Sequence, residues 1–296
     1  MRCPGCNLVF SNPMPTDEEL DRYYAEAYRF DYKGSHKPKA RRVLRASELA
    51  LHHTGYIARH VPPGAKTLDV GSGGGEMVYV LKRLGYDAHG IEPGEGYGRF
   101  SRDAYEIDVH VGPFRTYEAK PGSFDLVTCY HVLEHLPRPG EFFDFIAGLL
   151  RKGGHLIVQV PNIAKKDGSF RNRFHFAHVH HFSPATMKAF AEKSGFVLFD
   201  NLSADDGHSV YMHFTRGKPG GAKALAGAIE PDAEALARRL DEVGRRRAVI
   251  GKGWFEMRWA RLRRTIREYR LTLGARPEDV APRVVDHFLA RRAGRG

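Results

Sequence analysis

The stretch Leu68-Asp69-Val70-Gly71-Ser72-Gly73-Gly74-Gly75-Glu76 decides the fold of this 296-residue chain. The apolar run before the glycines predicts a short buried strand, and the pattern from Glu76 to Leu84 predicts a helix. Glycines let the backbone adopt positive φ angles and approach a ligand closely. The turn is therefore a candidate binding loop, although a tight strand-to-helix turn without a ligand has the same pattern.

Strand-like and helix-like patterns alternate on both sides of this turn. Besides the strand at residues 67–70, strands are predicted at residues 88–91, 109–111, 124–129, 155–160, 196–199 and 210–214. Helices are predicted between them at residues 76–84, 97–105, 141–150 and 184–194. Such alternation is typical of parallel βαβ units. The sequence therefore predicts an α/β fold with a Rossmann-like, doubly wound, mostly parallel seven-stranded sheet, in which ligands bind beyond the carboxyl ends of the strands.

The regions that flank these alternating patterns differ from them in composition. Residues 1–63 contain a pair of cysteines and helical patterns, including a capping box in which Thr16 would cap a helix with Glu19 at its third position. Residues 64–216 form the predicted binding domain. Residues 217–296 combine a Gly- and Pro-rich linker with an Arg-rich helical tail. We therefore expect an N-terminal helical segment, an α/β domain and a C-terminal helical extension.

Two acidic residues accompany the glycine turn. Glu92 follows Gly75 by 17 residues, at the end of the next predicted strand, where a carboxylate can accept hydrogen bonds from ribose hydroxyls. Asp69 lies two residues before Gly71. A carboxylate so close to the turn disfavours a pyrophosphate and suits a cationic ligand. The turn also lacks the Gly-Lys-Ser/Thr sequence of a nucleoside triphosphate loop.

The charge of the chain is concentrated near its C-terminus. The net charge is +11, and the residues from Arg216 onward contain 20 Lys or Arg against 10 Asp or Glu. The predicted binding domain therefore carries no general nucleic-acid signature. Three cysteines, with Cys129 in a predicted buried strand, favour a reducing cytoplasm over a disulfide framework. We expect neither a secretory signal nor a membrane-spanning segment, since no long apolar run is present.

Four segments resemble the class I S-adenosylmethionine-dependent methyltransferases in order and spacing. Asp69 to Gly75 resembles the first motif of that family, and Glu92 matches its ribose-binding acid. Residues 124–135 resemble the fourth-strand motif, and residues 149–158 resemble the segment that enters the fifth strand. The subgroup that the chain is most similar to comprises small-molecule enzymes, including the ubiquinone-biosynthesis O-methyltransferases and many sugar and natural-product methyltransferases.

This resemblance implies S-adenosyl-L-methionine as the cofactor and assigns roles to particular residues. In related enzymes the positions of Asp69 and of the turn residues Gly71, Ser72, Gly73 and Gly75 hold the methionine part, and the position of Glu92 holds the ribose. The resemblance further implies that Gly112 and Phe114 face the adenine and that Tyr130 and His131 line the sulfonium pocket. Many family members have an acidic residue that meets the adenine amine, and this chain has none between Val111 and Thr116.

Histidines are the candidate catalytic residues, because transfer to a hydroxyl needs a base near neutral pH. His131, Glu134 and His135 have i, i+3, i+4 spacing and would share one face of a helix. The ubiquinone enzymes have a Glu at the position of His131, and some bind a divalent metal through this cluster. His181 follows the fifth strand in a stretch of alternating histidines and aromatics that resembles an acceptor cover. For the cluster at residues 131–135 the alternatives are a base, a metal site at Glu134 and His135, and structural hydrogen bonding. For His181 the alternatives are a base and a packed β-ribbon.

The spacing of Cys3 and Cys6 is that of half a zinc site. A structural zinc ion needs four ligands, usually from two such pairs, and only one pair is present. The two cysteines are therefore weak candidates for metal binding.

The tail contains a heptad-like apolar seam on one predicted helix. The seam consists of Phe255, Trp259, Leu262, Ile266, Tyr269 and Leu273, and arginines cover much of the remaining surface. We expect the seam to dock on its own domain or on a second copy, which would form a homodimer. An interfacial membrane helix and an acidic or nucleic-acid partner are the alternatives.

The sequence favours a methyltransferase that acts on an oxygen, nitrogen or carbon atom of a small molecule. The first alternative is an RNA or other nucleic-acid methyltransferase that uses the basic tail. The residues Cys129-Tyr130-His131-Val132 weaken it, because enzymes that methylate base amines resemble one another in having Asn or Asp, Pro-Pro and an aromatic there. The second alternative is a non-catalytic binding protein, against which Asp69, the turn glycines and Glu92 all argue.

Overall fold

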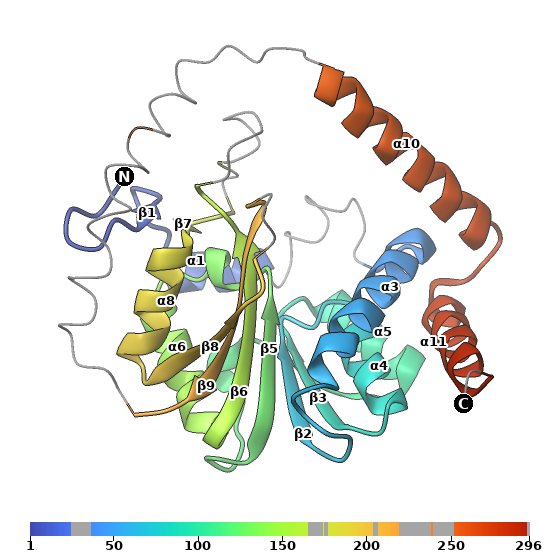
Figure 1. Cartoon of the computed structure of the whole chain (residues 1–296), viewed down its shortest axis with the longest axis horizontal. Helices are drawn as coiled ribbons and strands as arrows, with labels where there is room; N and C mark the ends of the chain where they lie inside the picture. The colour runs from blue at the N-terminus through green and yellow to red at the C-terminus, as the bar shows by residue number, and fades with distance from the viewer. Residues whose placement is uncertain are drawn as a thin grey trace. The chain divides into compact units, whose positions relative to one another are not determined.

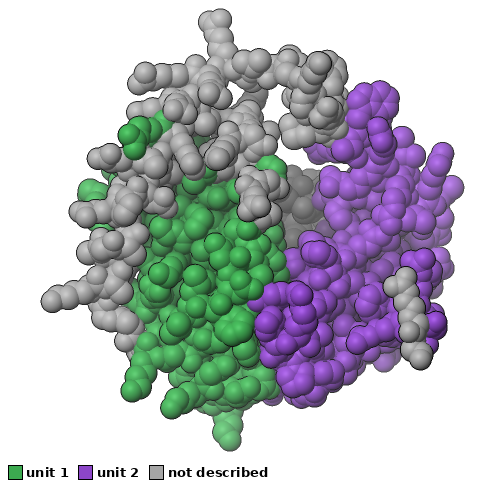
Figure 2. All heavy atoms as spheres, viewed as in Figure 1, with its two compact units in different colours: residues 1–20, 118–248 green, residues 21–117, 249–296 purple. Residues whose placement is uncertain are grey.

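The computed structural model describes residues 1–24, 37–164, 174, 177–203, 207–218, 238 and 252–294. The chain forms two compact units, coloured in Figure 2, which comprise residues 1–20 and 118–248 (unit 1) and residues 21–117 and 249–296 (unit 2). Seven strands form a sheet of order β4-β3-β2-β5-β6-β9-β8. The predicted α/β, Rossmann-like, mostly parallel seven-stranded fold is thereby confirmed. The sequence-based boundaries near residues 63 and 216 stay a prediction.

Unit 2 contains three parallel strands and the helices that follow them (Figure 1). Its elements in chain order are α3 (Ala40–Ile57), β2 (Lys66–Val70), α4 (Glu76–Arg83), β3 (Asp87–Glu92), α5 (Glu95–Tyr105), β4 (Asp108–Val111), the 3-10 turn η2 (Phe114–Thr116), α10 (Lys252–Thr272) and α11 (Pro277–Ala293). Strand β3 pairs in parallel with β2 and with β4. Fully buried aliphatic side chains such as Leu68, Val78 and Ile91 form the core, as expected for strands covered by helices.

Unit 1 combines parallel and antiparallel pairing. Its elements are β1 (Val9–Phe10), β5 (Phe124–Tyr130), the 3-10 turn η3 (Leu133–His135), α6 (Pro139–Leu149), β6 (Leu150–Pro161), β7 (His180–His181), α8 (Pro184–Lys193), β8 (Phe196–Asn201) and β9 (Ser209–Arg216). Strand β6 is parallel to β5 and antiparallel to β9. Strand β8 pairs antiparallel with β9, with a register shift between Leu198 and Asp200. Strands β1 and β7 form a separate two-stranded ribbon.

The capping box predicted at Thr16 is confirmed, and the structure shows a second one at Ser183. Helix α1 (Asp17–Arg22) begins after Thr16, whose hydroxyl accepts the Glu19 amide at 3.2 Å while its own amide donates to the Glu19 carboxylate at 2.9 Å. Helix α8 begins after Ser183, which makes the equivalent reciprocal pair with Thr186. These hydrogen bonds satisfy amides that the first turn of a helix leaves without partners.

Helices α10 and α11 confirm the helical character of the tail, but the docking of the apolar seam onto its own domain is wrong for the side chains the structure describes. Trp259, Leu262, Ile266, Tyr269 and Leu273 are all exposed. The side chain of Phe255 lies outside the described residues. None of the helices in the described part of the chain is long and apolar enough to cross a membrane.

Candidate functional site

The glycine turn connects β2 to α4 in unit 2. The amides of Gly71 and Ser72 both donate to the carbonyl oxygen of Ile91, at 2.7 and 2.9 Å, which ties the turn to the end of β3. Gly73 and Gly75 have φ angles of 59° and 82°, a region that favours glycine. The turn therefore has the positive φ angles that its glycines predicted.

Glu92 lies directly against this turn. Its side chain is 1% exposed, and its two carboxylate oxygens accept hydrogen bonds from the amides of Gly73 at 2.8 Å and Gly94 at 2.9 Å. Asp69 is also buried, at 5% exposure, and pairs with Gly90 across the β2–β3 ladder. The structure thus brings the predicted turn and its acidic partner together at the carboxyl ends of two neighbouring strands.

Gly112 and Phe114 follow the next strand of the same unit. The Gly112 amide donates to the backbone oxygen of Glu92 at 3.0 Å, and Phe114 is buried at the start of η2. The guanidinium carbon of Arg115 lies 5.5 Å from the centre of the Phe114 ring. Both predicted adenine-facing residues therefore lie after β4, beside the strand that ends at Glu92.

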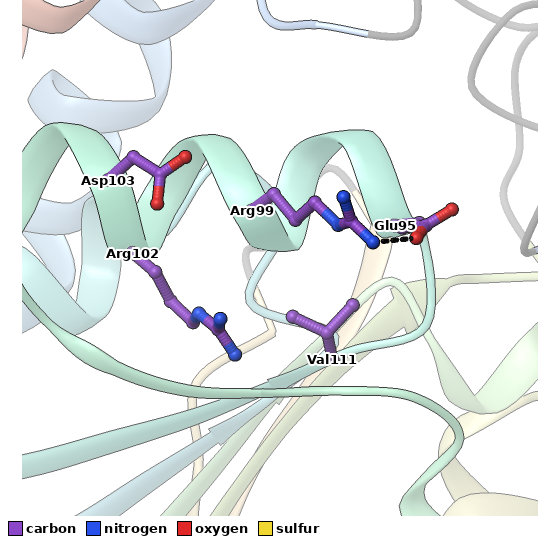
Figure 3. A pocket seen from close by; sticks show the side chains of 5 residues that line it. All are labelled: Glu95, Arg99, Arg102, Asp103 and Val111. Carbon is purple, nitrogen blue, oxygen red and sulfur yellow. Dashed lines mark hydrogen bonds and ion pairs between the residues drawn. The ribbon is translucent and has the colours of Figure 1, made fainter.

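A pocket of about 420 Å³ lies between α5 and the end of β4 (Figure 3). Its lining residues are Glu95, Arg99, Arg102, Asp103 and Val111, and an ion pair of 2.5 Å joins Arg99 to Glu95. Sequence reasoning named none of these residues as part of a site, since alternating charges on a helix are also typical of a solvated face. The pocket contains none of the predicted cofactor-binding residues.

In unit 1, His131 and Glu134 form an ion pair just beyond β5. The Nδ1 atom of His131 lies 3.4 Å from Oε1 of Glu134. His131 adopts a left-handed conformation with φ of 57°, and its side chain is 50% exposed. The segment is a 3-10 turn at residues 133–135, so the helical face expected from the i, i+3, i+4 spacing does not form. Backbone strain of this kind is concentrated at functional sites.

Glu134 is a buried carboxylate, 2% exposed. Apart from the ion pair with His131, its two oxygens have no hydrogen-bond partner among the described residues. Burial alone would raise the pKa of the Glu134 carboxyl, but the adjacent His131 and the charges of His135 and His178 hold this pKa below its ordinary value. The cluster therefore stabilises a negative charge in a site with little solvent.

His135 and His178 lie beside this carboxylate. In the described part of the chain, Glu134, His135 and His178 form the one group of three potential metal ligands, with ligand atoms within 4.8 Å of one another. The Nδ1 atom of His135 donates to the backbone oxygen of Ala177 at 2.8 Å, because a carbonyl oxygen only accepts. Sequence reasoning did not select His178, which is 43 residues away from His135 and is brought next to it only by folding.

His181 lies in the β1–β7 ribbon, where it pairs with Val9. Burial and the neighbouring His178 and His180 lower the pKa of His181 to about 4. Its ring makes an edge contact with Phe174 at 4.7 Å between centroids. His180 and His181 thus form one strand of a β-ribbon, while the role of His181 as a base stays a prediction, and His175 and Phe176 lie outside the described residues.

Tyr130, at the end of β5, packs against Tyr211 of β9. The two ring centroids are 6.2 Å apart. Burial raises the pKa of Tyr211, and a hydrogen bond with Tyr130 partly offsets that effect. Tyr130 precedes His131 in the chain, so the two residues predicted for the sulfonium pocket lie together at the tip of one strand.

Cys3 and Cys6 form a tight turn before β1. The Cys3 amide donates to the Leu8 oxygen, and the Asn7 amide donates to the Cys3 oxygen, both at 2.9 Å. Backbone hydrogen bonds lower the pKa of the Cys3 thiol, whereas burial raises that of Cys6. Within the described ranges no third His, Cys, Asp or Glu joins them in a cluster of possible metal ligands.

Comparison with known proteins identifies the family. Residues 40–200 match a family model described as a methyltransferase domain. The ubiquinone biosynthesis O-methyltransferase of Xanthomonas campestris pv. campestris is 34% identical over 164 residues, which cover 51% of this chain and 66% of that protein. The chain thus spans just under two thirds of the length of this relative. The enzyme of the same name from Xanthomonas axonopodis pv. citri is 30% identical over 200 residues, which cover 62% of this chain and 81% of that protein.

Solved structures agree on the fold. The magnesium protoporphyrin IX methyltransferase of Synechocystis PCC 6803, solved with bound SAH, has a TM-score of 0.52 at 15% identity. The match covers 68% of this chain and 100% of that chain. The chain belongs to the class I S-adenosylmethionine-dependent methyltransferases and is similar to the ubiquinone-biosynthesis O-methyltransferases.

Proposed function

We propose that Asp69, the Gly71–Gly75 turn and Glu92 hold S-adenosylmethionine. The observation that carries this proposal is the Glu92 carboxylate, buried and hydrogen-bonded to Gly73 of the turn. A carboxylate oxygen has more than one lone pair, so Glu92 can accept ribose hydroxyls in addition to these amides. The buried Ser72 hydroxyl has no hydrogen-bond partner among the described residues and offers one to a ligand. Buried Asp69 suits the positive charge of the ligand.

We further propose that the acceptor is a small molecule with a hydroxyl group. The relatives named above are O-methyltransferases, and transfer to oxygen requires removal of the hydroxyl proton. When bound, S-adenosylmethionine supplies an activated methyl group on a sulfonium, and the protein supplies position and a base. Among the described residues, the histidines around Glu134 are our candidates for this base.

His131 is the proposed base, and Glu134 is its positioning residue. A base that can reach an acceptor must be accessible, and His131 is half exposed whereas His135 and His181 are buried. The Glu134 carboxylate, kept ionised by the low pKa described above, faces Nδ1 of His131. It can orient the ring and stabilise the imidazolium formed when Nε2 takes the acceptor proton. His181, with its pKa near 4, is a weaker base.

The test of the cofactor site is calorimetric titration of the full chain with S-adenosylmethionine. Glu92→Ala and Asp69→Ala should each weaken binding by about a hundredfold or more, since each removes a buried charged partner of the ligand. Asp87→Ala is the matched control, because Asp87 begins the same strand that Glu92 ends and its side chain is exposed. Near-normal affinity in both site variants would place the cofactor elsewhere, and no binding by the unaltered chain would support a non-catalytic protein.

The test of the base uses methyl transfer to catechol, a small hydroxyl acceptor, from labelled cofactor. His131→Gln should leave cofactor affinity within about threefold and lower kcat by about 10²-fold or more. Glu134→Gln should lower kcat by a smaller factor than His131→Gln does. It should also change the acid limb of the pH profile of kcat. His135→Gln and His181→Gln are the comparison variants, and a larger loss in either would transfer the role to that residue. Inactivation by a chelator that added divalent metal reverses would instead favour a cation on Glu134, His135 and His178.

A further inference from the structure

Helix α10 attaches to unit 2 through its polar face. The Glu268 side chain is buried and accepts two hydrogen bonds from the Arg45 guanidinium of α3, at 2.8 and 2.6 Å. A second ion pair joins Arg267 to Glu48 of α3. Thr272, one turn beyond Glu268, is also buried. Figure 1 shows the C-terminal end of α10 next to α3. The usual arrangement, in which an apolar face packs inward, is therefore reversed.

The opposite face of α10 carries an exposed apolar stripe. The α10 stripe consists of Trp259, Leu262, Ile266, Tyr269 and Leu273, which immediately follows the helix, and each is between 44% and 86% exposed. At about 100° per residue these side chains fall within about 80° of arc on the side away from Glu268. Single exposed apolar residues are ordinary, but five in one continuous stripe mark an interaction surface.

Positive charge borders the α10 stripe on both sides. Arg263 and Arg270 lie next to Trp259 when the helix is viewed along its axis. Both are exposed, and neither forms an ion pair with a described residue. On the other side, the Arg41 guanidinium of α3 lies 5.2 Å from the centre of the Tyr269 ring. Glu268 is the one acidic residue between positions 259 and 273, and it is buried on the attached face. The stripe therefore combines apolar side chains with uncompensated positive charge.

We propose that the α10 stripe binds the surface of an anionic lipid membrane, with the helix lying parallel to it. An amphipathic helix with Trp and Leu on one face and Arg beside them enters the boundary between headgroups and acyl chains, and each nearby arginine strengthens binding to anionic lipid by about fivefold. The proposal concerns a surface of unit 2 and does not depend on the methyl acceptor.

Charge argues against the other occupants that the sequence left open. In a two-fold dimer the stripe would meet itself, which would bring Arg263 and Arg270 of one copy toward the same arginines of the other. A nucleic acid would use the arginines but would leave Trp259, Leu262 and Ile266 without an apolar partner. A lipid surface accommodates both the apolar residues and the arginines.

The test is flotation of the full chain with vesicles of phosphatidylcholine alone and with vesicles of equal parts phosphatidylcholine and phosphatidylglycerol. One variant, Trp259→Ser with Ile266→Ser, removes two apolar side chains from the stripe. A second, Arg263→Gln with Arg270→Gln, removes the charge and keeps the apolar face. Leu271→Ser is the matched control, because Leu271 is 56% exposed on the same helix but lies outside the stripe. All five substituted positions are exposed, so thermal unfolding should confirm that each variant is folded.

The expected result is binding to the anionic vesicles and at least tenfold weaker binding to the neutral ones, with a decrease as salt rises. The stripe variant and the arginine variant should each lose about tenfold or more, and Leu271→Ser should bind within about twofold of the unaltered chain.

Three outcomes would overturn the proposal. The first is no flotation of the unaltered chain, or an equal loss in Leu271→Ser. The second is a dimer in analytical ultracentrifugation that the stripe variant dissociates while vesicle binding stays unchanged, which would assign the stripe to a second copy. The third is RNA binding that depends on the arginines, in a chain whose vesicle binding is insensitive to the stripe variant.

Discussion

His181 shows how burial controls the charge of a side chain. It lies in a two-stranded ribbon, where its burial and the neighbouring His178 and His180 disfavour the imidazolium. Its pKa falls from 6.5 to about 4, so the ring is neutral at pH 7. In the unfolded chain the same ring would be protonated below its ordinary pKa.

This difference predicts acid-linked instability. Between pH 6.5 and about 4 the unfolded state binds a proton that the folded state excludes, so stability falls as pH falls through this window. The contribution of His181 to this loss is on the order of 3 kcal/mol, and it is absent above pH 6.5. Urea unfolding of His181→Gln over this range should show a shallower pH dependence. His208→Gln, at an exposed site in the same unit, is the control, and equal slopes for both variants would contradict the prediction.

The residues that carry charge next to a motif could be predicted from the sequence, and those assembled by folding could not. Asp69 and Glu92 could be selected because both lie at short sequence distances from the glycine turn, and the β2–β3 pairing then brings the two strand ends together. His178 was not, because its place beside His135 depends on the path of the chain after β6. The exposure of His131 likewise depends on the left-handed backbone conformation of His131 itself, which the spacing of the residues does not indicate.

At the scale of elements, the β2–α4 turn depends on Gly75. A Cβ atom there would lie 2.6 Å from side-chain carbons of both Ile107 and Ser101, in a backbone conformation that disfavours side chains. Gly75→Ala should therefore lower the free energy of unfolding by about 2–4 kcal/mol, combining left-handed strain with overpacking.

Gly64→Ala separates these two effects. Gly64 has a φ of 86°, close to the 82° of Gly75, but no atom lies within 4 Å of a Cβ built there. It should cost only about 1–2 kcal/mol, the cost of the backbone conformation alone. Denaturant unfolding of both variants measures the difference, and equal losses would show that the packing around Gly75 can adjust.

Helix boundaries that depend on local signals agree with the sequence-based prediction. The face that a helix turns toward its own unit does not always agree with it. The capping boxes at Thr16 and Ser183 mark helix starts, because their hydrogen bonds are local. Helix α10 also forms, but its apolar seam faces outward, because the pair between Arg45 and the buried Glu268 determines which side attaches. A rule that assumes apolar burial cannot predict an attachment made by charge.

For the whole molecule, binding of a ligand at the cofactor site should raise the free energy of unfolding. A ligand that binds only the folded state stabilises it by about 2.7 kcal/mol at a concentration a hundred times its Kd. S-adenosylhomocysteine should therefore raise the unfolding free energy of the full chain by about this amount. In Glu92→Ala the same ligand concentration should have little effect, and an undiminished effect would separate Glu92 from the site.

Strand β8 ends the sheet with an interrupted ladder. Val197 and Phe199 are exposed on this edge strand. An edge strand with exposed apolar side chains can pair with a strand from another chain. The irregularity between Leu198 and Asp200 takes the backbone out of register at that point, so an incoming strand could pair with only part of it. The same irregularity thus protects the protein against edge-to-edge aggregation without requiring polar side chains at those two positions.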